Sequence, residues 1–183
     1  MEVEGEPGIG YILRPGSLLP PLSFTEDELH ALVIGTQWVS RQADNSLAQA
    51  VTNALAKINA VLPAHLRPVI DDDAIYIGYP AKSAIPLNLS EVRRAIREQR
   101  KLRIKLPATH TLVGEHLIWP IMLGFIDGER FIAAWRETEE QFHVFGMSEI
   151  ESAEVLLERY ARNRRELVKA WQAQDLRPCN SRE

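Results

Sequence analysis

The sequence is poor in cysteine and has no residue pattern typical of a metal site. Its single cysteine among 183 residues, Cys179, permits no internal disulfide and no cysteine-based zinc site, which is consistent with a reducing compartment. No two histidines show the i, i+4 spacing of a metal-binding helix. The five histidines are His30, His65, His110, His116 and His143. We therefore expect no metal and no cofactor.

Long hydrophobic runs are also missing. The longest, residues 117–126, is shorter than the roughly 20 residues that a membrane-spanning helix needs, and Pro120 interrupts it. The first residues carry glutamates at positions 2, 4 and 6, where a secretory signal needs positive charge and then an apolar stretch. We expect a cytoplasmic protein with no membrane span.

The chain lacks an overall positive charge. It has 21 lysines and arginines against 25 aspartates and glutamates, a formal net charge of −4, so no global field draws it to nucleic acid. Acidic residues outnumber basic ones before Pro86, and the two kinds are nearly balanced after it. Residues 70–86 lie between these halves and include three aspartates, two prolines and no helical period, so we expect a linker there.

Motifs for catalysis and for phosphate loops are absent as well. No serine lies in the glycine-flanked turn of a hydrolase nucleophile, and Cys179 lies in a terminal segment with no base spaced to it. The run GEPGIG at residues 5–10 lacks the preceding strand and following helix that a phosphate loop requires. The aspartates at positions 71–73 lack the ligand spacing and glycine of a calcium loop. We expect no enzymatic activity.

The first half has the pattern of two helices. Thr25 and Glu28 form a capping box, which predicts a helix over residues 26–41. A second helix begins near Asp44 or Asn45, both of which are good N-caps, and ends before a proline. The two helices predict an antiparallel hairpin whose apolar faces need each other and either a third element or a second copy of the chain.

The second half changes from helical to alternating hydrophobicity. A helix over residues 89–101, which Ser90 can cap, comes first. Alternating segments follow, and Asp127-Gly128 is a hairpin turn between two of them. The segments lie at residues 101–106, 115–126, 130–136, 141–147 and 153–158. These strands predict an antiparallel sheet closed into a small barrel, which exposes no edge, and a final helix over 163–172 makes the fold class α+β.

A run of positive charge is the one local electrostatic feature. The thirteen residues 93–105 include seven cations and one acidic residue, Glu98. One interpretation is a solvated surface paired in part with the acidic first half, and the other is a helical stripe of arginines that binds phosphate groups. The cations are Arg93, Arg94, Arg97, Arg100, Lys101, Arg103 and Lys105. The aromatic residues in the strands are interpreted first as core residues. The alternative is that they stack on the bases of a nucleic acid or nucleotide.

The order of these segments resembles that of one family of bacterial regulators. The residues that carry the resemblance are GEPGIGYILRPGSLLPPLSFTEDELHALVIGTQWVSRQ, VRRAIREQRKLRIKL, LIWPIMLGFIDGERFIAAW and QFHVFGMSEIESAEVL. Over nearly its whole length the chain is similar to YafY-type regulators, which combine a winged helix-turn-helix, a helical connector and a WYL domain. The resemblance implies an Sm-like or SH3-like barrel in the second half, ligand sensing by that barrel, transcriptional control and often dimerisation.

The chain departs from this family in two places. The segment that resembles the family's wing is at the start of the chain, so we expect the recognition helix to be missing and DNA contact to be weak or through a partner. In the first sensing motif, Arg130, Phe131 and Ile132 replace the family's Trp-Tyr-Leu. In the second, His143, Gly146 and Glu149 replace three arginines. Loss of the arginines predicts weaker binding of the family's anionic ligand.

The resemblance implies a division of the chain and a function. The segments are a wing remnant (1–20), a helical connector (21–69), a linker (70–86), a WYL-like barrel domain (87–173) and a flexible tail (174–183). The function is the effector-sensing and dimerisation portion of a transcriptional regulator, with a nucleotide or oligonucleotide as effector. Phe131 is expected to stack on the ligand, His143 to make a hydrogen-bonding or charge-switchable contact and Arg103 to bind phosphate. Further phosphate contacts are Arg93, Arg97 and Arg100.

A second interpretation needs no ligand. The chain is then an interaction protein that pairs with a full-length regulator through the helical hairpin and modulates it. In both interpretations the partner is a second copy of the chain or a full-length relative. The contact residues are Trp38, Leu47, Val51 and Leu55. A hydrolase or transferase is a third class, and no motif supports it.

Overall fold

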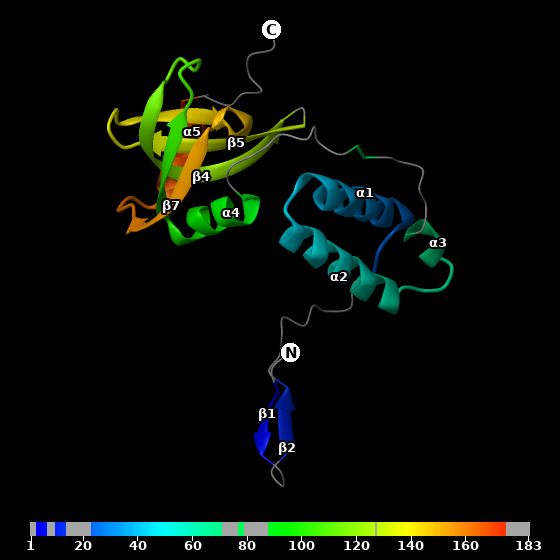
Figure 1. Ribbon diagram of the computed structural model, residues 1–183. Coiled ribbons are helices and arrows are strands. Elements are labelled where there is room, and N and C mark those ends of the chain that lie inside the picture. The colour runs from blue at the N-terminus through cyan, green and yellow to red at the C-terminus, as the bar shows by residue number, and fades with distance from the viewer. Residues whose placement is uncertain are drawn as a thin grey trace.

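The computed structural model describes residues 3–6, 10–13, 23–70, 77–78, 88–126 and 128–174. Three helices lie in the first half, followed by a helix, a five-stranded sheet and a last helix (Figure 1). Near the N-terminus, β1 (Val3–Glu6) pairs with β2 (Gly10–Leu13) in an antiparallel hairpin. In the described part of the chain, no helix is long and apolar enough to cross a membrane.

Two capped helices form the expected hairpin. α1 (Glu26–Gln42) begins at a capping box, in which Glu28 N donates to Thr25 Oγ1 (3.3 Å) and Thr25 N donates to Glu28 Oε2 (2.8 Å). α2 (Asn45–Val61) begins at Asp44, whose carboxylate accepts hydrogen bonds from the first-turn amides. The capping prediction is therefore confirmed at both helices, and Asp44 rather than Asn45 is the N-cap of the second.

A short third helix completes the helical body. α3 (Arg67–Ile70) packs its Val69 against Leu29 of α1 and Leu62, and these three residues are the buried centre of a small core. Partly buried side chains surround it: Phe24, Ile58, Leu66 and Ile70. A helix of four residues has no hydrophobic period, which is why the sequence pattern did not indicate it.

The second half is an antiparallel sheet, as predicted. Its strands are β3 (Arg100–Leu106), β4 (Gly114–Ile126), β5 (Glu129–Arg136), β6 (Gln141–Gly146) and β7 (Ser152–Arg159). The spatial order is β6-β5-β4-β3-β7, and every neighbouring pair is antiparallel. The α+β class and the five antiparallel strands are confirmed.

Closure of the sheet into a barrel was wrongly predicted. β6 and β7 are the two edges of the sheet, and no pairing joins them within the residues described. They are connected through η1 (Met147–Glu149), a single 3₁₀ turn. The reason is the helix α4 (Leu89–Glu98), which buries its apolar side chains in the core on one face of the sheet. Because a helix covers that face, the sheet buries it without closing on itself.

Both faces of the sheet are covered. One carries the core under α4, which includes Leu102, Ile104, Ile118 and Phe145. The other packs against α5 (Arg164–Ala173), whose Leu167 and Trp171 are buried. Burial on both sides holds α4 and α5 at fixed positions around the strands between them.

Tyr160 anchors the chain between β7 and α5. Its ring stacks on Trp119 with centroids 5.4 Å apart, and its hydroxyl donates to the Pro120 carbonyl at 2.9 Å. Burial raises the pKa of Tyr160 to about 12, so the hydroxyl keeps the proton that this hydrogen bond needs.

Several expected features lie wholly or partly outside the described residues. The wing remnant (1–20) is described only in its two strands, and most of the linker (70–86) and of the tail (174–183) lies outside. Asp127 of the predicted hairpin turn lies outside too, whereas its neighbour Gly128 has a φ of +81°, which favours glycine. The domain boundaries therefore stay predictions.

The N-cap of α4 differs from the prediction. Asn88, not Ser90, caps this helix, because its side-chain oxygen accepts from Ser90 N at 2.9 Å and from Ser90 Oγ at 3.0 Å. The helix ends at Glu98, before Gln99, whose φ of 56° is left-handed. Both residues are acceptable N-caps by type, and only the backbone conformation decides between them.

The cap assignment predicts different stability losses at the two positions. Asn88→Ala removes the acceptor of a first-turn amide and should lower the free energy of unfolding by about 1 kcal/mol. Ser90→Ala leaves that acceptor in place and should cost less. Urea unfolding followed by circular dichroism measures both, and equal losses would contradict the assignment.

Candidate anion-binding site

A cavity rich in arginine lies between α4 and the start of α5. It has a volume of about 400 Å³. Its lining residues are Arg93, Ile96, Arg97, Gln99, Asn163, Arg164 and Arg165. Four of the seven are arginines, so the cavity concentrates positive charge in a chain that is acidic overall.

Gln99 joins the two helices that form this arginine pocket. Its backbone carbonyl accepts from Tyr160 N at 3.0 Å, and its side-chain amide donates to the Arg162 carbonyl at 3.2 Å. The end of α4 is thereby tied to the chain just before α5. These bonds fix the distance between the arginines of the two helices.

Helix geometry aims the arginines into the pocket. Arg93 and Arg97 are one helical turn apart on α4, on a face other than the one that buries Val92 and Ala95. On the α5 side, Arg164 Nη1 donates to the Ile121 carbonyl at 3.1 Å, which holds that side chain against β4. The Arg164 guanidinium is thus partly held in place, which reduces the entropy lost when a ligand binds it.

The pocket is built to attract an anion. Asn163 caps α5 by accepting from Arg165 N at 2.8 Å, so the positive end of the helix dipole faces the same space. Arg97 and Arg165 are exposed, and neither forms a salt bridge with any residue that the structure describes. Guanidinium groups bind phosphate in a bidentate manner, so a ligand with adjacent phosphates matches this arrangement.

Two of the three predicted phosphate contacts meet in this pocket. Arg93 and Arg97 line it, whereas Arg100 lies on β3 and pairs with Glu98 at 2.7 Å. Sequence reasoning missed Arg164 and Arg165. Their signal was the pair of arginines directly after the N-cap Asn163, but only the tertiary structure brings that helix start to α4.

The predicted ligand residues do not converge on one site. Arg103 points away from the core under α4 and pairs with Glu154 of β7. The ring of Phe131 covers Gly124, where a Cβ atom would lie 2.0 Å from it. His143 lies on the opposite face of the sheet from these two, beside Phe145 at a centroid distance of 4.7 Å. The ligand role of each stays a prediction.

His143 belongs to a cluster around a buried arginine. Arg136 is 4% exposed and bonds Glu139 and His116, the latter at 3.4 Å. His110 lies 3.6 Å from Glu149. Burial lowers the pKa of His143, and the charge of Arg136 lowers it further. No set of three metal-ligating side chains occurs in the described ranges, this cluster included.

The predicted dimer contacts are mostly packed within the chain. Leu47, Val51 and Leu55 of α2 are half-buried. Trp38 of α1 is 37% exposed, and the edge of its ring contacts Phe125 of β4 with centroids 5.1 Å apart. Trp38 is therefore a contact between the helical body and the sheet, with one side open to solvent.

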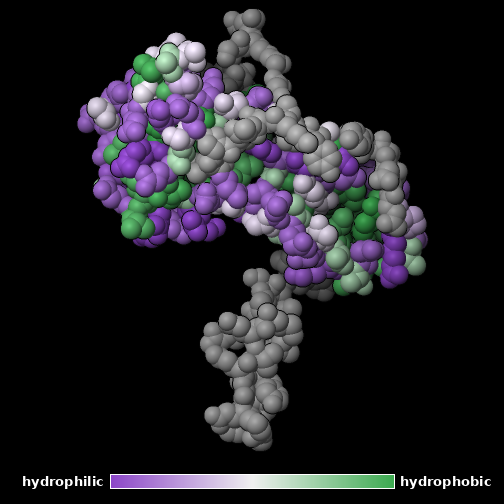
Figure 2. All heavy atoms as spheres, viewed as in Figure 1, coloured by the Kyte–Doolittle hydropathy of each residue, from purple (hydrophilic) through white to green (hydrophobic). Residues whose placement is uncertain are grey.

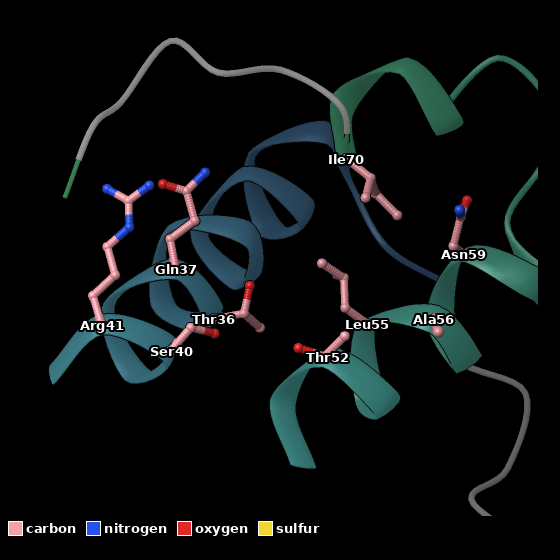
Figure 3. A pocket seen from close by; sticks show the side chains of 9 residues that line it. All are labelled: Thr36, Gln37, Ser40, Arg41, Thr52, Leu55, Ala56, Asn59 and Ile70. Carbon is pink, nitrogen blue, oxygen red and sulfur yellow. The ribbon is translucent and has the colours of Figure 1, made fainter. Parts of the chain in front are cut away.

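A second cavity, of about 390 Å³, lies among α1, α2 and α3 (Figure 3). Figure 3 shows Leu55 and Thr36 facing each other across it, with Ile70 at one end. Its single charged lining residue, Arg41, donates a hydrogen bond to the Ile77 carbonyl. The other lining groups are neutral, so this cavity offers less to a charged ligand than the arginine pocket does.

Comparisons with known proteins give few parallels. No protein-family model matches the sequence, and no curated protein matches it. Among solved structures, the chain is similar to proteasome accessory factor B/C (PafBC) of Arthrobacter aurescens, with 22% identity and a TM-score of 0.39. The alignment covers 78% of this chain and 22% of that one, so this chain spans about a fifth of that protein.

The environment of His143 predicts a pH-dependent stability. Its pKa is lower in the folded than in the unfolded state, so the unfolded state binds the proton more readily. The stabilising contribution of the neutral ring is complete above about pH 6.5 and is lost as the pH falls toward the folded pKa. The free energy of unfolding should therefore fall from about pH 7.5 to about pH 5.5 by more in the wild type than in His143→Gln.

Urea unfolding at the two pH values measures this difference. His65→Gln, a change at an exposed histidine, is the control and should keep the wild-type dependence. A His143→Gln variant with the full wild-type dependence would show that another group causes it.

Proposed function

We propose that this chain is the effector-sensing portion of a WYL-type transcriptional regulator, and that its effector carries phosphate groups. The observation that carries the proposal is the pocket between α4 and α5, where four arginines and the start of a helix surround one cavity. The resemblance of the sequence to YafY-type regulators supports the regulatory role. The arrangement of a helical hairpin beside an antiparallel sheet is consistent with it.

The chemistry of the pocket favours binding over catalysis. Its lining offers guanidinium groups, two amide side chains and Ile96. An arginine does not lose its proton in a protein, so it cannot serve as a general base, and no nucleophilic side chain lines this cavity among the residues described. A ligand held there is bound and not transformed. This supports a sensor rather than an enzyme.

The same proposal includes a cytoplasmic location and an indirect path to DNA. The negative net charge disfavours nonspecific binding to nucleic acid. Sequence-specific contact then comes from a recognition helix outside this sequence or on a partner chain. A nucleotide or a short oligonucleotide fits the effector role, because both present adjacent phosphate groups to the arginines.

Calorimetric titration with inorganic pyrophosphate and ATP tests the effector site. Each of Arg97→Gln and Arg165→Gln should weaken binding by about tenfold or more, since each removes a charge-assisted contact. Arg94→Gln is the matched control, because it removes the same charge from an exposed residue of α4 that does not line the pocket. Wild-type affinity should also fall as salt is raised.

Two results would contradict the assignment. One is a wild-type protein that binds neither compound. The other is an Arg94→Gln variant that loses as much affinity as the two pocket variants, because the effect would then come from net charge alone.

We also propose that the helical body pairs with a second copy or a full-length relative. Leu32 and Trp38 of α1 and Val61 of α2 are exposed large apolar residues, at 36%, 37% and 79%. Figure 2 shows hydrophobic residues gathered on the helical body near α3. Exposed apolar groups of this kind are typical of interaction surfaces.

Sedimentation at tens of micromolar tests this pairing. The wild type should form a dimer, and Leu32→Glu should weaken the association by about tenfold or more by placing a charge in the contact. Leu157→Glu is the control, since Leu157 is exposed on β7 away from the helical body. A wild-type protein that stays monomeric, alone and with a full-length relative, contradicts the proposal.

A further inference from the structure

Arg93 takes part in two interactions that a ligand would bring into competition. It lines the arginine pocket and it pairs with Asp44 at the junction of α1 and α2. We propose that a phosphate ligand in the arginine pocket withdraws Arg93 from Asp44 and so releases the helical body from the sheet. This inference rests on the proposed function, because it requires the ligand to bind in that pocket.

Arg93 is the partner of one carboxylate oxygen of Asp44. Asp44 Oδ1 accepts from Ser46 N at 3.0 Å, Leu47 N at 3.1 Å and Ser46 Oγ at 2.6 Å. Its Oδ2 is buried, accepts no hydrogen bond and lies 3.3 Å from Arg93 Nη1. The side chain is only 5% exposed. Removal of Arg93 therefore leaves a buried charged oxygen without a partner.

The carboxylate of Asp44 is ionised in this setting. Burial raises its pKa, but hydrogen bonds from Ser46 and Leu47 and the charge of Arg93 outweigh burial and hold the pKa below its ordinary value. With Arg93 in place Asp44 is charged near neutral pH, and a buried carboxylate that loses this partner needs another one. It must gain contact with water, which requires the start of α2 to move.

A phosphate ligand competes well for Arg93. The Arg93 side chain is 28% exposed and lines the pocket, so a ligand reaches it without displacing the core. Among the described residues of the helical body, Arg93 bonds one other besides Asp44, through a long bond from Nη2 to Ser46 Oγ at 3.5 Å. Two adjacent phosphates carry more negative charge than one carboxylate, and Arg97 and Arg165 beside Arg93 hold them in place.

Other contacts between described residues also join the helical body to the sheet. Arg130 of β5 donates from Nε and Nη2 to the Gln42 carbonyl at 3.3 and 3.0 Å. Trp38 contacts Phe125 edge-on. Figure 1 shows that α4 is the element of the sheet side next to the start of α2. Loss of the pair of Arg93 with Asp44 removes one of these contacts and shifts the balance between attached and released forms.

Linkage gives a sharp test of this competition. If ligand binding breaks the pair of Arg93 with Asp44, removal of the Asp44 charge must strengthen ligand binding. Asp44→Asn suits the test, because asparagine is as good an N-cap as aspartate and keeps α2 capped. Glu91→Gln is the matched control: it removes an exposed carboxylate from α4, close to Arg93 in sequence.

Calorimetry with inorganic pyrophosphate gives the first readout. Asp44→Asn should bind pyrophosphate about 5-fold to 100-fold more tightly than the wild type, the usual range for coupled sites. Glu91→Gln should stay near the wild-type affinity.

Amide hydrogen exchange in the wild type gives the second readout and needs no variant. Pyrophosphate should speed exchange at Ser46 and Leu47, whose amides the Asp44 carboxylate holds.

The outcomes separate the two proposals. If the wild type does not bind pyrophosphate, the proposed function fails, and this inference fails with it. If the wild type binds, but Asp44→Asn matches Glu91→Gln and exchange at α2 is unchanged, the effector site stands and its coupling to the helical body is refuted.

Discussion

Burial of the apolar face of α4 against the sheet is the interaction on which the fold and the candidate site both depend. Leu89, Val92 and Ala95 enter the core beside strand residues such as Ile104 and Phe145. The helix thereby covers a face that the open sheet would otherwise expose. Its remaining surface carries the arginines, so the packing that stabilises the sheet also places Arg93 and Arg97 at the edge of the pocket.

The positive run after residue 92 divides into two parts with different roles. On β3, Arg103 forms a cross-strand ion pair with Glu154 of β7, and Lys105 pairs with Glu151, the residue just before β7. Lys101 also pairs with glutamates, and these pairs raise its pKa. On α4, by contrast, Arg93 reaches the helical body. The expected pairing with the acidic first half thus occurs at one described residue, Asp44.

Arg93 lies both in the arginine pocket and in the contact between α4 and the helical body. Asp44 follows α1, and its carboxylate both caps α2 and pairs with the guanidinium of Arg93, so one carboxylate joins α2 to α4. Buried ion pairs contribute little to net stability because desolvation offsets much of the attraction, but breaking one is costly. Such a pair suits a junction with two states better than it suits a permanent core.

The sequence by itself determined the longer helices, the five strands of the sheet and the α+β class. Capping at Thr25 and the alternation from Lys101 to Leu106 depend on residues a few positions apart, so their signals are local and complete in the sequence. Only the tertiary structure decided that the sheet stays open, that Asn88 is the cap of α4 and that Arg164 and Arg165 complete the pocket. The physical reason is that these outcomes depend on backbone conformation and on contacts between distant parts of the chain, and hydrophobic periodicity carries no information about which distant side chain neutralises a given charge.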